Sequence, residues 1–253
     1  MRGRGERREA GRPGLVAGSH ARAAGGGKTS LAGGASSRPS GRSLSVAGPN
    51  SAARLEVPKD VRGLIFDCDG TLVDTLPLHY AAWKTTFAEL GLSCPLEFLI
   101  EHNGKPTEHI VGLYNARFDR RIDVEQFTAD KERRTHELLR QARPLEPVAA
   151  LARRYHGRLP MAVVSGSNRP NVELALRAAG LAALFSVVLT ADDGLPPKPA
   201  PDLFLEAARR LNVEPRACQV FEDADSGLEA ARLAGMLATD VRPFGGGYSR
   251  ASE

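Results

Sequence analysis

One stretch decides the fold of this chain: Leu64-Ile65-Phe66-Asp67-Cys68-Asp69-Gly70-Thr71-Leu72-Val73. Its apolar start is typical of a buried strand, and Gly70 marks the point where the chain turns. The strand brings Asp67 and Asp69 to its carboxyl end, where open α/β sheets bind their ligands. Side chains two residues apart point the same way along an extended chain. We therefore expect both carboxylates in one polar site.

Two neighbouring carboxylates repel each other unless a cation lies between them or one of them is protonated. The pair therefore indicates an acid–nucleophile site that also binds a hard metal ion. The alternative is that Asp67 and Asp69 only stabilise a turn, as Asp often does before Gly. The whole stretch from Asp67 to Asp74, directly after a strand, favours the catalytic interpretation.

The sequence Asp67-Cys68-Asp69-Gly70-Thr71-Leu72-Val73-Asp74 resembles the first motif of the haloacid dehalogenase-like phosphohydrolases. The resemblance implies that Asp67 is the nucleophile and Asp69 the general acid/base. It gives the Cys68 thiol no chemical role.

A second apolar run, Met161–Ser165, ends in a hydroxyl group followed by Gly166. Such a pair offers an O–H and a backbone N–H to a phosphoryl oxygen. Alternatively, Ser165 or Ser167 caps the helix that follows. The resemblance implies that Ser165, with Gly166 beside it, binds the phosphoryl group.

Lys198 lies among four prolines, in Pro196-Pro197-Lys198-Pro199-Ala200-Pro201-Asp202. Prolines restrict φ, so this loop presents the lysine from a stiff backbone. A single loop lysine is otherwise usually just solvated. The resemblance implies that Lys198 neutralises the phosphoryl group and the nucleophile.

A third apolar run ends in Glu222 and Asp223. Mg²⁺ prefers oxygen ligands and needs only one or two carboxylates besides water and substrate phosphate. The resemblance makes Asp223 a metal ligand with Glu222 beside it, so the predicted Mg²⁺ site comprises Asp67, Asp69, Glu222 and Asp223. Asp225 is interpreted as the N-cap of a helix that starts at Ser226.

Residues 59–253 alternate short apolar runs with amphipathic segments, which predicts α/β architecture with a Rossmann-like, doubly wound parallel sheet. The expected strands are Gly63–Asp67, Met161–Ser165, Val187–Thr190, Cys218–Phe221 and Ala238–Val241. The expected helices between them are Val172–Ala179, Asp202–Leu211 and Ser226–Ala234. A further helical block, with segments Pro77–Leu90, Thr107–Arg117, Val124–Ala142 and Pro147–Tyr155, predicts an inserted cap.

The predicted domains are a disordered basic extension (1–58), an α/β core (59–76 and 156–245), a helical cap (77–155) and a flexible C-terminus (246–253). The extension holds 12 of the 26 glycines and carries ten basic against three acidic residues, a charge of +7. It cannot bury enough apolar surface to offset its ordering entropy. Four alternatives stay open for it: a wrongly assigned start, a targeting peptide, a nucleic-acid-binding arm, or a solubilising tail. Residues 59–253 carry about −3.

Several functional classes are excluded on sequence grounds. Gly25-Gly26-Gly27-Lys28-Thr29-Ser30 lacks the first glycine of a P-loop and a preceding strand. The three cysteines have no metal-binding spacing and indicate a reducing compartment. No apolar stretch approaches the length of a membrane span. We expect a cytoplasmic monomer without nucleic-acid or membrane partners, or an organellar protein if the extension is a transit peptide.

From Arg62 to Pro243 the chain resembles the β-phosphoglucomutase-like branch of the family, and above all its small phosphosugar phosphatases of the fructose-1-phosphate and 6-phosphogluconate type. His79 and the cap-loop residues Asn103, Lys105 and Thr107 are its candidate substrate contacts. Mutases of this branch carry two basic residues where Asn103 and Thr107 stand, although Lys105 is near.

The resemblance therefore implies a Mg²⁺-dependent phosphatase for a small phosphorylated sugar or polyol, acting through a phosphoaspartate. A phosphosugar mutase and a catalytically inactive binding scaffold are the alternatives.

Overall fold

The computed structural model describes residues 55–247 of the chain. Most of the predicted N-terminal extension, and with it the question of its disorder and function, lies outside these residues. Within the described range, no helix is long and apolar enough to cross a membrane.

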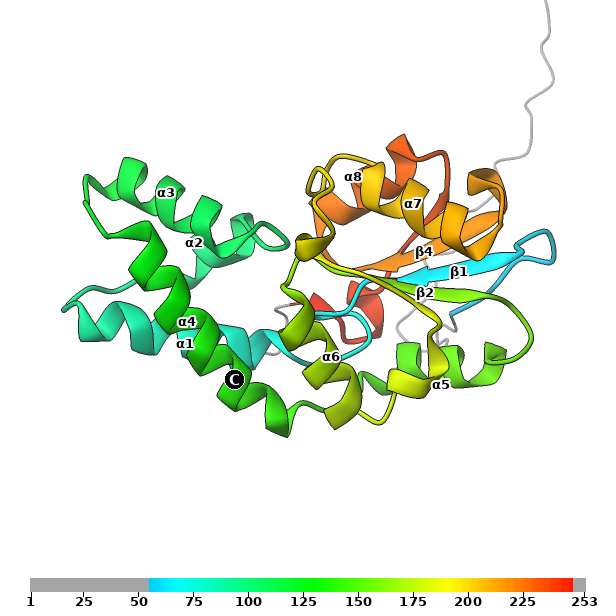
Figure 1. The fold of residues 1–253 in the computed structure, drawn as a ribbon, viewed down its shortest axis with the longest axis horizontal. Helices are drawn as coiled ribbons and strands as arrows, with labels where there is room; N and C mark the ends of the chain where they lie inside the picture. The colour runs from blue at the N-terminus through cyan, green and yellow to red at the C-terminus, as the bar shows by residue number, and fades with distance from the viewer. Residues whose placement is uncertain (1–54, 248–253) are drawn as a thin grey trace, which may run out of the picture. The chain divides into compact units, whose positions relative to one another are not determined.

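Five parallel strands form the sheet of the described region, in the spatial order β3-β2-β1-β4-β5 (Figure 1). They are β1 (Gly63–Phe66), β2 (Met161–Val164), β3 (Val187–Leu189), β4 (Cys218–Glu222) and β5 (Leu237–Asp240). The predicted doubly wound parallel sheet with a helical insertion is therefore confirmed, and every predicted strand lies within two residues of an observed one.

Alternating residues of the central strand face two different hydrophobic clusters. Leu64 and Phe66 pack with residues of α5 (Glu146–Tyr155) and α6 (Arg169–Ala178). Ile65 packs with residues of α7 (Asp202–Leu211) and α8 (Asp225–Leu233). Figure 1 shows these two helix pairs on opposite faces of the sheet. Burial on both faces explains why the strand sequences read as continuous apolar runs.

The strand order reverses next to β1. From β1 the chain adds β2 and β3 on one side, and it then crosses back to place β4 and β5 on the other side. Ligands of open α/β sheets bind outside the carboxyl ends of the strands at such a reversal. Asp67, Ser165 and Asp223 each follow a strand that ends here, which brings them to one edge of the sheet.

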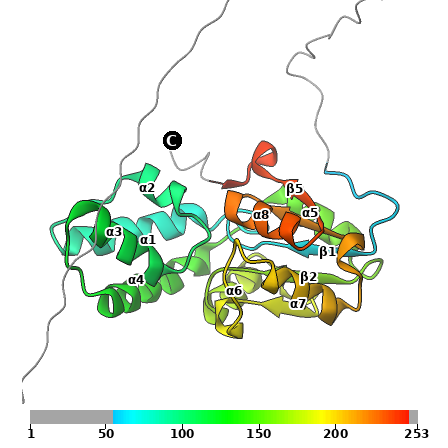
Figure 2. The same cartoon turned by 90° about the horizontal axis from the view of Figure 1, so that it is seen from above.

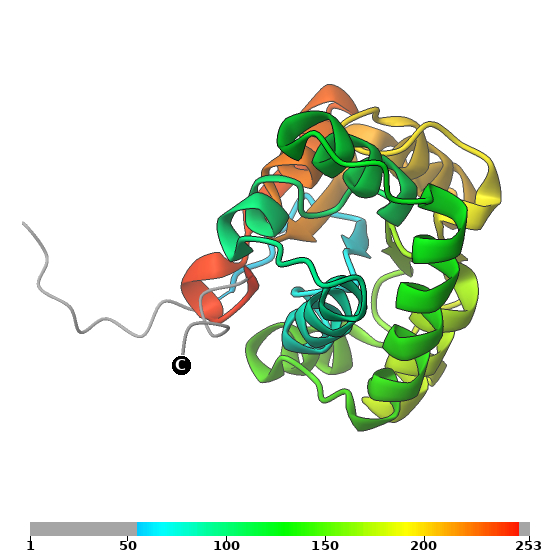
Figure 3. The same cartoon turned by 90° about the vertical axis from the view of Figure 1, so that its left-hand side faces the viewer.

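An insertion between β1 and β2 carries the helices α1 (Leu76–Glu89), α2 (Leu96–Glu101), α3 (Thr107–Phe118) and α4 (Val124–Leu138). These helices have a hydrophobic cluster of their own, comprising Trp83, Phe87, Phe98, Leu99, Ile110, Val111, Tyr114 and Phe127. Phe87 lies at its centre, with ring centroids 4.5 Å from Tyr114 and 4.7 Å from Phe127. Figure 2 shows the four helices grouped beside the sheet, and in Figure 3 the same helices lie in front of it.

The last helix of the insertion packs differently from the first four. Val148, Ala149, Leu151 and Ala152 of α5 belong to the same cluster as β1 and β2. Helix α4 ends at Leu138, and a 3-10 turn, Leu139–Gln141, follows within the segment predicted as one helix. We therefore propose that the cap consists of α1–α4 and that α5 belongs to the core.

Two of the expected helix starts that differ from the structure lie next to the predicted site residues. Helix α8 begins at Asp225 with Ala224 as its N-cap, so the interpretation of Asp225 as the N-cap is wrong. Asp225 instead pairs with Arg242 at 2.9 Å. Helix α6 begins at Arg169, and the Asn168 side chain caps it by accepting from the Asn171 N–H. This cap leaves the hydroxyls of the preceding serines available for the site.

Candidate active site

Lys198 links two carboxylates at the centre of the site. Its Nζ donates to Asp67 Oδ1 at 2.7 Å, to Glu222 Oε2 at 2.7 Å and to the backbone oxygen of Val164 at 3.2 Å. These bonds use all three donors of the ammonium group. Burial alone would lower the pKa of Lys198, but Asp67 and Glu222 raise it above its usual value. The lysine therefore stays charged and offsets part of the negative charge around it.

Asp67 is held at the end of β1, where its backbone N–H donates to the Phe221 oxygen at 3.0 Å. The side chain is buried. Burial and the neighbouring Glu222 carboxylate raise the pKa of Asp67 well above its usual value, against the opposing effect of Lys198. A second positive charge beside Asp67 would favour its ionised form.

Glu222 and Asp223 are fixed by the turn from β4 into α8. Glu222 Oε1 accepts from the backbone N–H groups of Asp223 and Ala224, at 3.1 and 3.0 Å. A Cβ on Gly227 would lie 2.0 Å from Glu222 Oε2, so only glycine leaves room for this carboxylate. Asp223 Oδ1 accepts from the Thr71 hydroxyl at 2.8 Å.

Three of these carboxylates are arranged as metal ligands. Asp67, Glu222 and Asp223 each offer an oxygen within 4.8 Å of the others, and all three residues are buried. Burial, and after it repulsion from the Glu222 carboxylate, raises the pKa of Asp223 to about 8. A cation among them would relieve this repulsion. The all-oxygen donor set fits Mg²⁺.

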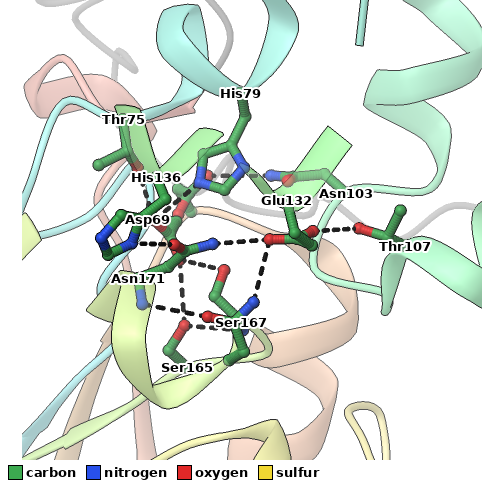
Figure 4. A network of polar contacts seen from close by, with 12 residues as sticks. Asp69, Thr75, His79, Asn103, Thr107, Glu132, His136, Ser165, Ser167 and Asn171 are labelled. Carbon is green, nitrogen blue, oxygen red and sulfur yellow. Dashed lines mark hydrogen bonds and ion pairs between the residues drawn. The ribbon is translucent and has the colours of Figure 1, made fainter. Parts of the chain in front are cut away.

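The Asp69 carboxylate lies outside this metal cluster. Its Oδ1 accepts from Thr75 Oγ1 at 2.7 Å and contacts His79 Nε2 at 3.3 Å. Its Oδ2 accepts from the hydroxyls of Ser165 and Ser167, at 3.0 and 2.8 Å. Burial alone would raise the pKa of Asp69, but these hydrogen bonds, above all that of His79, hold it well below its usual value. The predicted Asp pair is thus divided into two different environments, and Figure 4 shows that of Asp69.

The loop after β2 places Ser165 and Gly166 against the cap. Ser165 Oγ accepts from the Ser167 N–H at 3.0 Å while it donates to Asp69. A Cβ on Gly166 would lie 2.7 Å from the backbone oxygen of Gly104 in the cap loop. Glycine at position 166 is therefore needed for the close approach of these two loops.

The three predicted cap-loop residues make different contacts. Asn103 Nδ2 donates to Asp223 Oδ2 at 3.3 Å, and Thr107 Oγ1 donates to Glu132 Oε1 at 2.7 Å. Lys105 Nζ lies 3.3 Å from His102 Nδ1, within the cap loop. Asn103 and Thr107 therefore bring no positive charge to the cavity, and the loop's contribution is Lys105.

A line of polar groups that sequence reasoning missed runs from Asp69 into the cap. His79 Nδ1 lies 3.3 Å from Lys131 Nζ, which donates to Glu132 Oε1 at 2.9 Å. Lys131 also lies 5.3 Å from the centroid of the Trp83 ring. In the sequence, Lys131 and Glu132 lie in a polar helical segment, which is typical of a solvent-exposed face. Only the contact of Lys131 with His79 and that of Glu132 with Thr107 show that they belong to the site.

A cavity of about 160 Å³ joins the two parts of the site. The core contributes Asp67, Asp69, Gly166, Ser167, Asn168, Glu222 and Asp223 to its lining, and the cap contributes His79, Trp83, Asn103, Lys105, Thr107, Thr128, Lys131 and Glu132. The core side of the cavity is thus lined by the carboxylates beside Lys198, and the cap side combines polar groups with apolar side chains such as Leu99 and Ile110. This arrangement suits a small ligand with an anionic group at one end and hydroxyl groups at the other.

Comparison with known proteins agrees with this geometry. Fructose-1-phosphate phosphatase YqaB of Escherichia coli is 40% identical over 180 residues, which cover 71% of this chain and 96% of YqaB. A CbbY structure from Rhodobacter sphaeroides, in complex with xylulose-(1,5)bisphosphate, has a TM-score of 0.63 at 26% identity and covers 76% of this chain and 90% of its own. The structure of β-phosphoglucomutase from Clostridium difficile has a TM-score of 0.62 at 24% identity and covers 71% of this chain and 84% of its own.

The family comparison covers the same region. The haloacid dehalogenase-like hydrolase family matches residues 61–235, which include β1, the whole insertion and the carboxylates that follow β4. The chain is therefore an enzyme of the haloacid dehalogenase-like hydrolase family.

Proposed function

We propose that this protein is a Mg²⁺-dependent phosphatase that hydrolyses a small phosphorylated sugar or polyol through a phosphoaspartate on Asp67. The observation that carries the proposal is the buried cluster in which Lys198 bonds both Asp67 and Glu222, with Asp223 beside them. The likeness to a fructose-1-phosphate phosphatase supports the substrate class.

In the first step, the free oxygen of Asp67 attacks phosphorus and the bond from phosphorus to the sugar oxygen breaks. Asp69 in its protonated form gives a proton to the departing alkoxide, and because its hydrogen bonds favour the ionised form, only the protonated fraction of the enzyme takes this step. Lys198 holds the other Asp67 oxygen at 2.7 Å and so fixes the direction of the attacking one. The Ser165–Gly166 loop orients the phosphoryl group, because Ser165 is held in place through Asp69 and Ser167. Most of the catalysis of phosphoryl transfer comes from such positioning and charge stabilisation.

In the second step, water attacks phosphorus, its proton goes to Asp69, and the bond between phosphorus and Asp67 breaks to release phosphate. Asp69 has then regained the proton that it gave away. Asp67, Glu222 and Asp223 would hold Mg²⁺, which supplies positive charge for the phosphoryl oxygens when bound. Asn103 fixes Asp223 from the cap side.

Hydrolysis is favoured over a mutase reaction by the cap loop. A mutase must also hold the second phosphate of a bisphosphate, which needs cations at the cap end of the cavity. Asn103 and Thr107 are neutral, and their side chains already bond Asp223 and Glu132. Lys105 is the loop's cation, and its Nζ lies against His102.

The test is a phosphate-release assay with Mg²⁺ over a panel of sugar and polyol phosphates that includes fructose 1-phosphate. We expect turnover of at least one monophosphate and loss of turnover with EDTA. With β-glucose 1-phosphate and a trace of the 1,6-bisphosphate, rapid formation of glucose 6-phosphate with little free phosphate would establish the mutase instead. Tight binding without any turnover would support an inactive scaffold. The monomeric state and the absence of nucleic-acid partners stay predictions.

A further inference from the structure

Three segments of the chain meet at Glu132, which lines the cavity. Its Oε1 accepts from Thr107 Oγ1 at 2.7 Å and from Lys131 Nζ at 2.9 Å. Its Oε2 accepts from Asn168 Nδ2 at 3.0 Å and from Asn171 Nδ2 at 2.6 Å. Thr107 begins α3, Lys131 belongs to α4, and the two asparagines belong to the start of α6 in the core. Figure 4 shows Glu132 between Thr107 and Asn171.

These contacts leave Glu132 no free acceptor. A carboxylate offers about four lone-pair sites, and four donors occupy them here. Burial would raise the pKa of Glu132, but Lys131 and Thr107 keep it below its usual value, so the group is an anion. Although it lines the cavity, Glu132 is therefore poorly suited to bind a substrate hydroxyl. Its contacts instead connect the cap to the core.

The Lys131 contact extends the effect of Glu132 to the proposed acid/base. An ammonium group only donates hydrogen bonds, so His79 Nδ1, which faces it at 3.3 Å, must be the accepting nitrogen. A neutral imidazole then carries its proton on Nε2, which faces Asp69 Oδ1 at 3.3 Å. The position of Lys131 thus fixes which way His79 donates.

We propose that Glu132 is a positioning residue, which clamps α3, α4 and α6 together and holds Lys131 against His79 so that the His79 hydrogen bond fixes the orientation of the Asp69 carboxylate. The inference rests on the proposed function, because it assigns Asp69 the part of the acid that protonates the leaving group. It adds a specific requirement: the side chain at position 132 must be an anion, because it holds the Lys131 ammonium group.

The test compares four variants in the full chain. Glu132→Gln keeps the shape of the side chain and removes its charge. Lys131→Met removes the link to His79, while Asn171→Leu keeps that link and removes the contacts of α6 with Glu132 and His136 of α4. Glu137→Gln is the matched control, because it removes the same charge from an exposed position of α4. Melting temperatures are measured for all four.

The first readout is the leaving-group dependence of kcat/KM. A sugar alkoxide needs a proton when it leaves, whereas p-nitrophenolate does not, and general acid catalysis contributes about 10²–10⁴-fold. We expect Glu132→Gln and Lys131→Met to lower kcat/KM at least about tenfold for fructose 1-phosphate but less than about threefold for p-nitrophenyl phosphate. Asn171→Leu should lower the melting temperature without changing this ratio, and Glu137→Gln should change neither.

The second readout does not depend on turnover. The ¹⁵N signals of the His79 ring, assigned with a His79→Gln variant, should show a protonated Nε2 and an unprotonated Nδ1 in the wild type. Glu132→Gln and Lys131→Met should mix the two tautomers, and Asn171→Leu should not. If Glu132→Gln fails to fold, the contrast between Lys131→Met and Asn171→Leu decides.

Equal losses for both phosphate esters, or unchanged His79 signals in Lys131→Met, would overturn the positioning role. If the wild type hydrolyses no phosphate ester, the proposed function fails, whereas the His79 signals still decide whether the clamp exists.

Discussion

At the scale of single residues, the site separates two neighbouring aspartates by their partners. Burial and the neighbouring carboxylates raise the pKa of Asp67 although Lys198 opposes them, whereas hydrogen bonds, above all that of His79, lower the pKa of Asp69 against the effect of its burial. One aspartate is therefore placed at the charged end of the cavity and the other beside the cap. Two side chains that the sequence alone makes look equivalent therefore meet different environments.

Replacing the proposed nucleophile gives the most direct test at this scale. Asp67→Asn keeps the size of the side chain and an acceptor for Lys198 but removes the attacking anion. We expect kcat to fall by about 10³-fold or more, because a lost nucleophile removes the covalent route. Circular dichroism and the melting temperature should stay close to those of the wild type, as they should for the exposed control Asp60→Asn, which should keep full activity. A variant that keeps a tenth of the turnover would contradict the covalent mechanism, since that loss is only about 1.4 kcal/mol.

At the scale of secondary-structure elements, helix α8 presents the metal cluster through its close approach to β4. A Cβ at Gly227 would overlap Glu222 Oε2, whereas a Cβ at Gly112, also in a helix, meets nothing within 4 Å. Gly227→Ala should therefore displace Glu222, lower the affinity for Mg²⁺ at least about tenfold and lower the melting temperature. Gly112→Ala should instead stabilise α3 by about 1 kcal/mol through helix propensity. Titration with Mg²⁺ measures the affinity of both variants, and urea unfolding should show a loss of stability for Gly227→Ala and a gain for Gly112→Ala.

The turn after β3 gives a prediction for pH. Asp193 accepts from Thr190 N–H and Oγ1 at 2.8 and 3.1 Å, and it pairs with Arg169 at 2.7 Å. Burial opposes the charge, but the Thr190 hydrogen bonds and Arg169 hold the pKa of Asp193 below its usual value. Its stabilisation is therefore complete above about pH 4 and is lost as the pH falls through the lower folded-state value. Asp193→Asn should cost about 1–2 kcal/mol at pH 7.

The pH dependence of the stability difference between wild type and Asp193→Asn shows whether the charge of Asp193 causes it. Urea unfolding of wild type and Asp193→Asn at pH 7 and pH 3 should show a smaller gap at the acidic pH. A gap that stays constant would assign the effect to side-chain packing instead.

The elements also show which features a sequence can predict. The strands were predicted because they are buried on both faces, which produces uninterrupted apolar runs. The predicted bounds of α7 also agree with the structure, where Pro201 precedes the helix and Asn212 ends it in a left-handed conformation. Helix α2 was missed because it has only six residues and no capping side chain. The position of α5 against the sheet was missed because helical periodicity shows that a face is apolar but not which partner it meets.

The sequence likewise predicted some residues of the site and missed others. The sequence motifs supplied the residues at strand ends, since neighbouring parallel strands bring their carboxyl ends together. The motifs could not supply Lys131 and Glu132, because the role of these residues depends on distant contacts. Lys131 contacts His79, about 50 positions earlier in the chain, and Glu132 contacts Asn168, 36 positions later.

At the scale of the whole molecule, the boundary of the folded domain lies before the end of the predicted extension. Leu55 is buried in the cluster that contains β1, Val57 packs against that cluster, and the backbone oxygen of Glu56 accepts from Gln219 at 3.0 Å. These three residues belong to the segment predicted to be a disordered tail. The structure therefore assigns them to the core, and it is the basic residues before them that remain a candidate for removal.

Two truncations test this boundary. Removal of residues 1–54 should leave kcat, KM and the melting temperature unchanged, because the remaining chain keeps Leu55, Glu56 and Val57. Removal of residues 1–58 should lower the stability by about 2–4 kcal/mol, since it strips a buried leucine from the core and leaves a buried Gln219 amide without its backbone partner. Thermal unfolding of the two proteins gives the comparison, and equal melting temperatures would mean that the contacts of residues 55–57 contribute nothing.

The same proteins test whether the charge of the extension has a function of its own. The segment 1–58 carries +7, and an arm that binds phosphate backbones would lose affinity steeply as salt rises. We expect the full chain to bind nucleic acid only weakly and only at low salt, because the segment has no aromatic side chains on which bases could stack. Fluorescence anisotropy with a labelled oligonucleotide, at about 50 and 150 mM salt, measures this directly. Binding that persists at the higher salt and disappears on removal of residues 1–54 would show that the basic segment is a nucleic-acid-binding arm.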